Sequence, residues 1–240
     1  MSVDSLVTRE FLVANLGRTR YGETWDLQHK LFELRRDDQI DDMLLFTEHE
    51  HVYTIGKGGD DNHLLASDGE LSASGAEVFH IDRGGDITYH GPGQVVGYPI
   101  IDLHQHSPDI HKYLRQLEEV IIGALSAYGI EGTREEGMTG VWIHGEKVAA
   151  LGVRVSRWVT MHGFALNVNT DLARFGRIIP CGIFHKGVTS MKQILGREIP
   201  LEEVEDKLTE FFASVFRSTA VVITPDALRK RVLSVKGEPS

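Results

Sequence analysis

The chain has 240 residues, of which 41% are hydrophobic and 25% charged, so we expect one well-buried core and a single domain over residues 1–240. Its formal net charge of −10 argues against a nucleic-acid partner, because phosphate backbones repel an acidic surface. A lone cysteine excludes an internal disulfide, and no membrane-spanning run or signal-peptide pattern is present, so we expect a cytoplasmic protein with no membrane partner.

Apolar alternation and short runs rich in Val and Ile predict strands, most of them separated by glycine-rich turns. In chain order, the predicted strands are 9–16, 42–47, 51–55, 77–82, 95–101, 139–143, 147–155 and 158–168. Helical spacing predicts helices at 23–36, 109–128 and 200–217, and a short final helix from Pro225 to Val235. Because strands and helices mix without regular alternation, we predict an α+β fold with helices packed on a mixed, largely antiparallel sheet.

Two segments stand apart from this pattern. The stretch 171–199 has weaker periodicity and is the best candidate for a small cap or subdomain. Residues 83–94 read Arg-Gly-Gly-Asp-Ile-Thr-Tyr-His-Gly-Pro-Gly-Gln, and these glycines require tight bends or a close approach of the backbone to a ligand. Their polar neighbours could hold an acyl carbonyl or a carrier arm, while a plain hairpin loop is the alternative. The glycine spacing matches neither a Walker A loop nor a dinucleotide-binding loop.

Cys181 is the only cysteine, and it lies between Pro180 and Gly182, which favour an exposed turn. A cysteine thiolate can hold an acyl group between two half-reactions. A small buried core residue is the alternative role for a lone cysteine. Because a free thiol has a pKa of about 8.5, a catalytic cysteine would need a neighbouring cation or base.

Four ordered blocks of the chain, within about residues 9 to 220, resemble the lipoyl(octanoyl) transferases. The blocks are 48–57, 83–94, 140–154 and 162–167 running on to 179–183. One departure is His51, which stands where this family commonly has proline. The resemblance implies the fold of the biotin and lipoate protein ligase catalytic domains. It also implies an acyltransferase that carries out the first step of endogenous protein lipoylation, with no cofactor.

The resemblance also implies roles for individual residues. It makes Cys181 the nucleophile that carries the octanoyl group as a thioester, and Lys147 its catalytic partner. From the residues alone, a lysine at a strand start is more often a solvated turn residue. The substrate-binding residues that it implies are Arg83, Gly84, Gly85, Asp86, Ile87, Thr88, Tyr89, His90, Ala150, Leu151, Gly152, Gly163, Phe164 and Ala165. His90 could orient the lysine, relay a proton near neutral pH, or simply bond within its own loop.

The partners that the resemblance implies are acyl carrier protein as donor and lipoyl domains as acceptors, in 2-oxoacid dehydrogenase E2 subunits and in glycine cleavage H protein. We expect a monomer. Since these carriers are acidic, basic residues should surround the mouth of the site. The candidates are Lys57, Arg83, Arg154, Arg157, Lys186 and Lys192, each of which could instead be a solvated surface charge.

Three other functions compete with this interpretation. An ATP-dependent lipoate or biotin ligase would share the fold and the lysine but would need no cysteine. A zinc hydrolase is suggested by the pairs His49-x-His51 and His104-x-His106, but no further ligands at recognisable spacing complete either pair, so we expect no metal. A noncatalytic carrier-binding module would require an unreactive Cys181.

Overall fold

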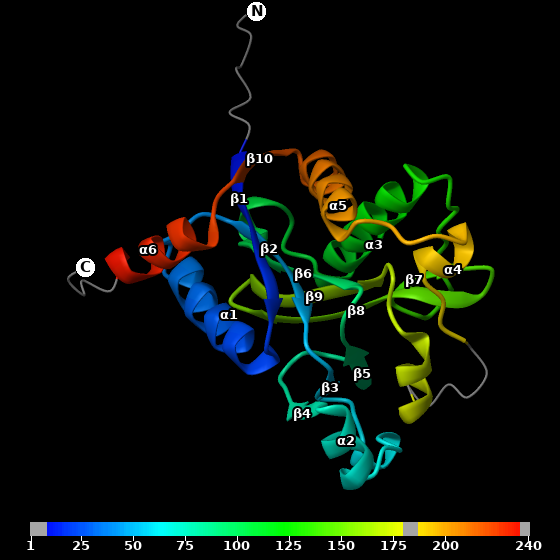
Figure 1. Cartoon of the computed structure of the whole chain (residues 1–240). Helices are drawn as coiled ribbons and strands as arrows, with labels where there is room; N and C mark the ends of the chain where they lie inside the picture. Colours follow the sequence, from blue (N-terminus) through cyan, green and yellow to red (C-terminus); the bar gives the residue numbers. More distant parts are fainter. Residues whose placement is uncertain (1–8, 180–186, 236–240) are drawn as a thin grey trace, which may run out of the picture.

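The computed structural model describes residues 9–179 and 187–235, and Figure 1 traces the chain. Among these residues, the larger sheet has seven strands in the order β10-β1-β2-β6-β9-β8-β7. They are β1 (Arg9–Thr19), β2 (Met43–His49), β6 (Gln94–Ile100), β7 (Val141–Ile143), β8 (Glu146–Ser156), β9 (Val159–Asn167) and β10 (Ser218–Val222). Strands β10, β1 and β2 pair in parallel, and the pairs from β2 to β7 are antiparallel, so the prediction of a mixed, largely antiparallel sheet is confirmed.

A smaller sheet in the order β4-β3-β5 lies below the larger one in Figure 1. It consists of β3 (Val52–Ile55), β4 (Glu77–His80) and β5 (Ile87–His90). Because β2 and β3 follow each other along the chain, and β5 and β6 do the same, the two sheets meet where β6 begins. The short elements η1 (Asp61–His63) and α2 (Asp68–Ser74) connect β3 to β4.

Helices cover both faces of the larger sheet (Figure 1). Helices α3 (Ile110–Ser126) and α5 (Leu201–Phe216) share one hydrophobic cluster with the sheet, and α1 (Tyr21–Arg36) and α6 (Pro225–Val235) share the other. In α5 the buried residues Val204, Leu208, Phe212 and Phe216 recur every four positions, which places one apolar stripe against the core. Strand β6 is buried along its whole length because helices cover both of its faces.

Every predicted strand and helix is present, with boundaries shifted by a few residues. Among the described strands and α-helices, β5, β10, α2 and α4 (Met191–Leu195) were not predicted. Strand β5 lies inside the glycine-rich segment 83–94, where turn residues mask the strand pattern. The candidate cap region 171–199 contains η3 (Leu172–Arg177) and α4, but its residues 180–186 lie outside the described part of the chain. None of the described helices combines the length and the apolar character needed to cross a bilayer.

Candidate active site

A cavity of about 500 Å³ lies where the smaller sheet meets β8 and β9, a size that falls within the usual range for small-molecule sites. Its wall combines the segment 83–90 with parts of β6, β8 and β9, the start of α1 and the start of α3. Most of the lining side chains are apolar or small, and the remaining polar or charged groups can bind a ligand or take part in a reaction. The polar and charged lining residues are Tyr21, Arg83, Asp86, Thr88, His90, Tyr98, Thr139, Lys147 and His162.

The structure brings together most of the residues that the sequence predicted for the site. The predicted residues that line the cavity are Arg83, Gly84, Gly85, Asp86, Ile87, Thr88, His90, Lys147, Ala150, Leu151, Gly152, Gly163, Phe164 and Ala165. Cys181 lies outside the described residues. Tyr89 does not line the cavity, since side chains alternate along β5 and it faces the other way. Its hydroxyl lies 2.7 Å from Nδ1 of His51, and its ring packs against Tyr53.

Arg83 anchors the glycine-rich segment to strand β3. Its guanidinium donates to the backbone oxygen of Thr54 at 2.8 Å and to that of Asp86 at 2.8 Å. The segment passes very close to β8, because a Cβ placed on Gly152 would lie 2.9 Å from both Cδ of Arg83 and the oxygen of Gly84. Glycine at this position therefore lets the two chains touch where they form the cavity wall.

Lys147 is held by backbone bonds at the start of β8. Its N–H donates to the oxygen of Gly187 at 3.0 Å, and its own oxygen accepts from the N–H of Thr189 at 3.0 Å. Its Nζ lies 5.0 Å from the centroid of the Trp142 ring, within the distance at which an aromatic face attracts an ammonium group. The backbone that directly follows the undescribed segment is thereby tied to the cavity wall.

His90 is buried between aromatic rings. The ring of Tyr21 lies nearly parallel to it at 6.2 Å, and the ring of His49 meets it edge-on at 5.9 Å. Burial, reinforced by nearby positive charges, lowers the pKa of His90 to about 3, so its ring is neutral at neutral pH. A ring that stays neutral does not favour the proton-relay role among those expected for His90, whereas orienting the lysine or bonding within its own loop requires only a neutral ring.

His162 lines the cavity, and it was not among the predicted site residues although it begins the block 162–167. Its Nε2 lies 2.8 Å from the Asp82 carboxylate, which also pairs with Arg154 at 2.6 Å. The hydrogen bond from His162 outweighs burial and, with the charge of Arg154, lowers the pKa of Asp82 to about 2. The backbone φ of His162 is +59°, an uncommon left-handed conformation for a residue other than glycine. Together these contacts fix the ring of His162 at the wall.

Other lining residues were missed because they carry no motif. They are Tyr21, Val96, Tyr98, Ile110, Leu114, Met138, Val153, Phe175 and Val188, among others. Leu114, for example, lies within the predicted helix 109–128, where helical spacing indicates only a side chain of the apolar face. An apolar side chain that lines a cavity has the same sequence signal as one that fills the core, so periodicity cannot separate the two.

The basic residues expected around the mouth of the site have different environments. Lys57 and Arg157 are exposed, whereas Arg83 is 7% exposed and so adds no surface charge. Arg154 forms an ion pair with Asp82 at 2.6 Å, and Lys192 forms one with Glu198 at 2.7 Å. Lys186 lies outside the described residues. Over the described ranges 9–179 and 187–235, no group of three or more His, Cys, Asp and Glu side chains could hold a metal ion.

The comparisons of this sequence with a family model and with known proteins agree with one another. The family model described as "Lipoyl protein ligase A/B catalytic domain" matches residues 20–213. A protein of Flavobacterium psychrophilum named "Octanoyltransferase" is 52% identical over 224 residues, covering 86% of this chain and 97% of the relative. One of the same name from Rubrobacter xylanophilus is 54% identical over 201 residues, covering 83% of this chain and 90% of the relative.

Solved structures with low sequence identity share the fold. Lipoate-protein ligase A bound with ATP superposes with a TM-score of 0.73 at 14% identity, covering 96% of this chain and 95% of the other. A bipartite lipoate protein ligase from Thermoplasma acidophilum superposes with a TM-score of 0.73 at 16% identity, covering 96% and 93%. These structural similarities confirm the predicted fold class. They do not identify the reaction, which has to be inferred from the residues of the cavity.

Proposed function

The chain belongs to the lipoyl protein ligase A/B catalytic domain family, and on this premise we propose that it transfers octanoyl from acyl carrier protein to a lysine of lipoyl domains through a thioester on Cys181. Its relatives, about half identical to it, are octanoyltransferases, so this chain is an acyltransferase of protein lipoylation. The acceptors in this proposal are the lipoyl domains of 2-oxoacid dehydrogenase E2 subunits and glycine cleavage H protein.

The observation that carries the proposal is the position of Lys147 on the wall of a largely apolar cavity. An apolar cavity of about 500 Å³ suits a medium-length acyl chain better than a charged nucleotide. A lysine at its wall can stabilise a thiolate as an ammonium, or accept a proton as a neutral amine. Both roles are needed at different stages of acyl transfer to an amine.

Support for Cys181 comes from the described residues on either side of it. Phe175 and Val188 both line the cavity, so described residues before and after Cys181 in the sequence reach its wall. The backbone N–H of Ile179, two residues before Cys181, donates to the oxygen of His63 at 2.8 Å. Since the sequence contains no other cysteine, a thioester intermediate requires Cys181.

The proposed reaction has two half-reactions. In the first, the Cys181 thiolate attacks the donor thioester carbonyl, a new carbon–sulfur bond forms, and the carrier thiolate leaves and is protonated. In the second, the acceptor lysine amine attacks the Cys181 thioester, the amide forms, and the cysteine thiolate is released. A neutral Lys147 accepts the proton that the amine loses in this step.

The test is intact mass of the protein after mixing with octanoyl-acyl carrier protein. We expect an octanoyl adduct on the natural protein that a lipoyl domain without its modification discharges. The Cys181→Ser variant should form no adduct. The Lys147→Met variant should form it at least about 100-fold more slowly, because the thiolate loses its neighbouring cation or base.

A matched control is Lys207→Met, which removes a surface lysine paired with Glu210 on α5 and should leave the rate of adduct formation unchanged. Absence of the adduct on the natural protein, with product formed only from free octanoate and ATP, would mean that the chain is a ligase. An adduct that persists in Cys181→Ser would remove the assignment of the nucleophile.

A further inference from the structure

A chain of side-chain amides runs from His90 to the backbone beside Lys147. Nδ1 of His90 lies 2.8 Å from Oε1 of Gln94, and Nε2 of Gln94 lies 2.9 Å from Oδ1 of Asn167. Nδ2 of Asn167 donates to the oxygen of Thr189 at 3.1 Å. Gln94 and Asn167 are 1% and 4% exposed, so their amides are largely shielded from bulk solvent.

Two backbone carbonyl groups, those of Thr189 and Tyr89, determine which atom donates and which accepts in every hydrogen bond of this chain. The oxygen of Thr189 can only accept, so Asn167 must present its NH₂ group there and its oxygen to Gln94. Gln94 also donates to the backbone oxygen of Tyr89 at 3.3 Å, which leaves its Oε1 facing His90. An amide oxygen cannot donate, so the proton of the neutral His90 ring must be on Nδ1, and Nε2 is left as the acceptor.

The end of this hydrogen-bonded chain opposite His90 is bonded to the backbone of Lys147. Thr189 accepts from Asn167 through its oxygen, and its N–H donates to the oxygen of Lys147 at 3.0 Å. A side pocket of about 20 Å³, enough space for one water molecule, lies between these groups and is lined by Gln94, Asn167 and Lys147, together with Thr88. The amide chain is thus continuous with the wall of the main cavity.

We infer that Gln94 and Asn167 are positioning residues that fix the Nδ1–H tautomer of His90 and hold the strand carrying Lys147 in register with it. This inference rests on the proposed function, because it concerns how the lysine of that site is placed. Neither amide needs to touch the acyl group. Their effect reaches the reaction only through the two side chains that line the cavity.

The first measurement is the ¹⁵N spectrum of the histidine-labelled natural protein, with the His90 signals identified by their loss in His90→Gln. We expect Nδ1 of His90 to carry the proton and Nε2 to be unprotonated at neutral pH. In Gln94→Met the acceptor for Nδ1 is removed, and we expect the Nε2–H form to appear. A proton found on Nε2 in the natural protein would overturn the inference, whatever the protein's activity.

The second measurement is the rate of Cys181 octanoylation in Asn167→Asp. This change keeps the shape of the side chain but places a carboxylate oxygen against the oxygen of Thr189. We expect the maximal rate to fall about tenfold to a hundredfold through misplacement of Lys147, while the KM for octanoyl-acyl carrier protein changes less than about twofold. A matched control is Gln193→Glu, an exposed amide on α4, which should behave as the natural protein.

The two measurements separate this inference from the function on which it rests. If the natural protein forms the adduct and Asn167→Asp, shown to be folded by circular dichroism, forms it equally fast, the function stands and the positioning role is wrong. If the natural protein forms no adduct, the proposed function is wrong, and the tautomer of His90 still decides whether the amide chain is assigned correctly.

Discussion

Strand β6 begins in one buried polar network and ends at another, and the two differ in charge. At its first residue, Gln94 joins neutral groups, a histidine and a second amide, beside the cavity. Just after its last residue, Asp102 contacts Arg35 on α1 and Asp42 immediately before β2. Roughly 25 Å of extended chain separates the two networks. The neutral network borders the cavity and its side pocket, whereas none of the charged residues lines either of them.

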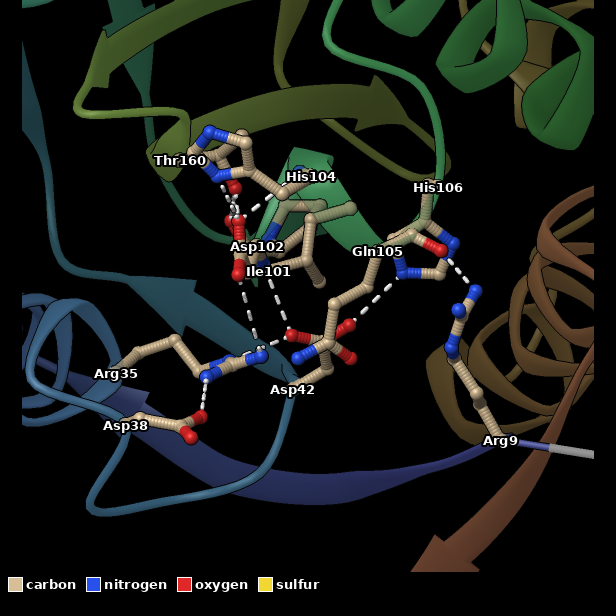
Figure 2. Close-up of polar contacts among 11 residues, drawn as sticks. Arg9, Arg35, Asp38, Asp42, Ile101, Asp102, His104, Gln105, His106 and Thr160 are labelled. Atoms are coloured by element: carbon tan, nitrogen blue, oxygen red, sulfur yellow. Dashed lines mark hydrogen bonds and ion pairs between the residues drawn. The ribbon is translucent and has the colours of Figure 1, made fainter.

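The charged network joins the end of α1 to the segments just before β2 and just after β6 (Figure 2). Nε of Arg35 donates to Asp42 at 2.7 Å, and Nε2 of His106 lies 2.8 Å from the other oxygen of Asp42. The backbone N–H of Asp102 donates to Asp42 at 2.9 Å. Burial alone would raise the pKa of the Asp42 carboxyl, but the bonds from His106 and Arg35 lower it below its ordinary value.

The two ends of β6 have different roles. Charged groups that pair with one another hold a fixed geometry, so the charged network acts on stability. Neutral amides and a neutral histidine can be buried at a smaller cost and still direct a lone pair or a proton toward a cavity. Variants at the two ends should therefore separate stability from catalysis.

The largest effect should follow from Asp42→Ala in the charged network. Removal of this carboxylate leaves Arg35, which is 3% exposed, without its main buried partner. We expect the free energy of unfolding to fall by about 3–5 kcal/mol, measured by urea denaturation. The octanoylation rate of the protein that remains folded should be unchanged, because the network does not contact the cavity.

The control for this variant is Asp37→Asn, which breaks the exposed pair with Arg36 and should leave the unfolding midpoint nearly unchanged. A loss of transfer rate in folded Asp42→Ala would contradict the separation of roles. It would mean that strand β6 couples the two networks.

An intermediate effect is expected at the cavity from Gly152→Ala. The new Cβ would lie 2.9 Å from Cδ of Arg83 and from the oxygen of Gly84, so the glycine-rich segment must shift. We expect a stability cost of about 2 kcal/mol and a roughly tenfold higher KM for octanoyl-acyl carrier protein, because the segment forms part of the cavity wall. Steady-state kinetics and denaturation measure the two effects separately.

Gly69→Ala provides a matched control in α2, where an added Cβ has no neighbour within 4 Å. It should leave the KM unchanged and, as a helical alanine, should not lower stability. If Gly152→Ala leaves the KM unchanged, the close approach of the glycine-rich segment is a packing feature and is not part of substrate binding.

The sequence predicted regular elements well because their signals are local. Helix α5 repeats its apolar residues every four positions, and the spacing alone indicates both the helix and its buried face. Contacts between distant segments leave no such signal. Asn167 and Gln94 are 73 positions apart, and nothing in either neighbourhood indicates that their amides meet.

The candidate site was found in the sequence mainly through the family resemblance. Local pattern marked the glycine-rich segment and the lone cysteine, but it treated Lys147 as an ordinary turn residue. It also gave His90 an ordinary histidine pKa, because burial depends on Tyr21 and His49, which reach it only through the fold. Tyr89 was included with its neighbours because a motif read as a loop does not reveal which side chains face inward along β5.

The smallest effect should come from Glu205, a buried carboxyl on α5 that accepts a hydrogen bond from the amide of Asn15 on β1. Burial, together with the charges of Glu202 and Asp206 on its own helix and of Glu48 on β2, raises the pKa of Glu205 to about 7 against the bond from Asn15. Glu205 is buried like Asp42, but no cation within residues 9–179 and 187–235 forms an ion pair with it.

The sign of its pH dependence follows from the raised pKa. Below about pH 4 the folded and unfolded states both hold the proton on Glu205. As the pH rises from about 4 to 7, the unfolded chain releases this proton while the folded chain keeps it, so the free energy of unfolding falls and the loss is complete above about pH 7.

Glu205→Gln removes this pH-dependent fall in the free energy of unfolding but keeps an oxygen for Asn15. We expect the variant to match the natural protein near about pH 4 and to be about 1 kcal/mol more stable near about pH 8, measured by urea denaturation at both pH values. A gain of equal size at both pH values would mean that packing, and not the unmatched charge, separates Glu205 from the fully paired Asp42.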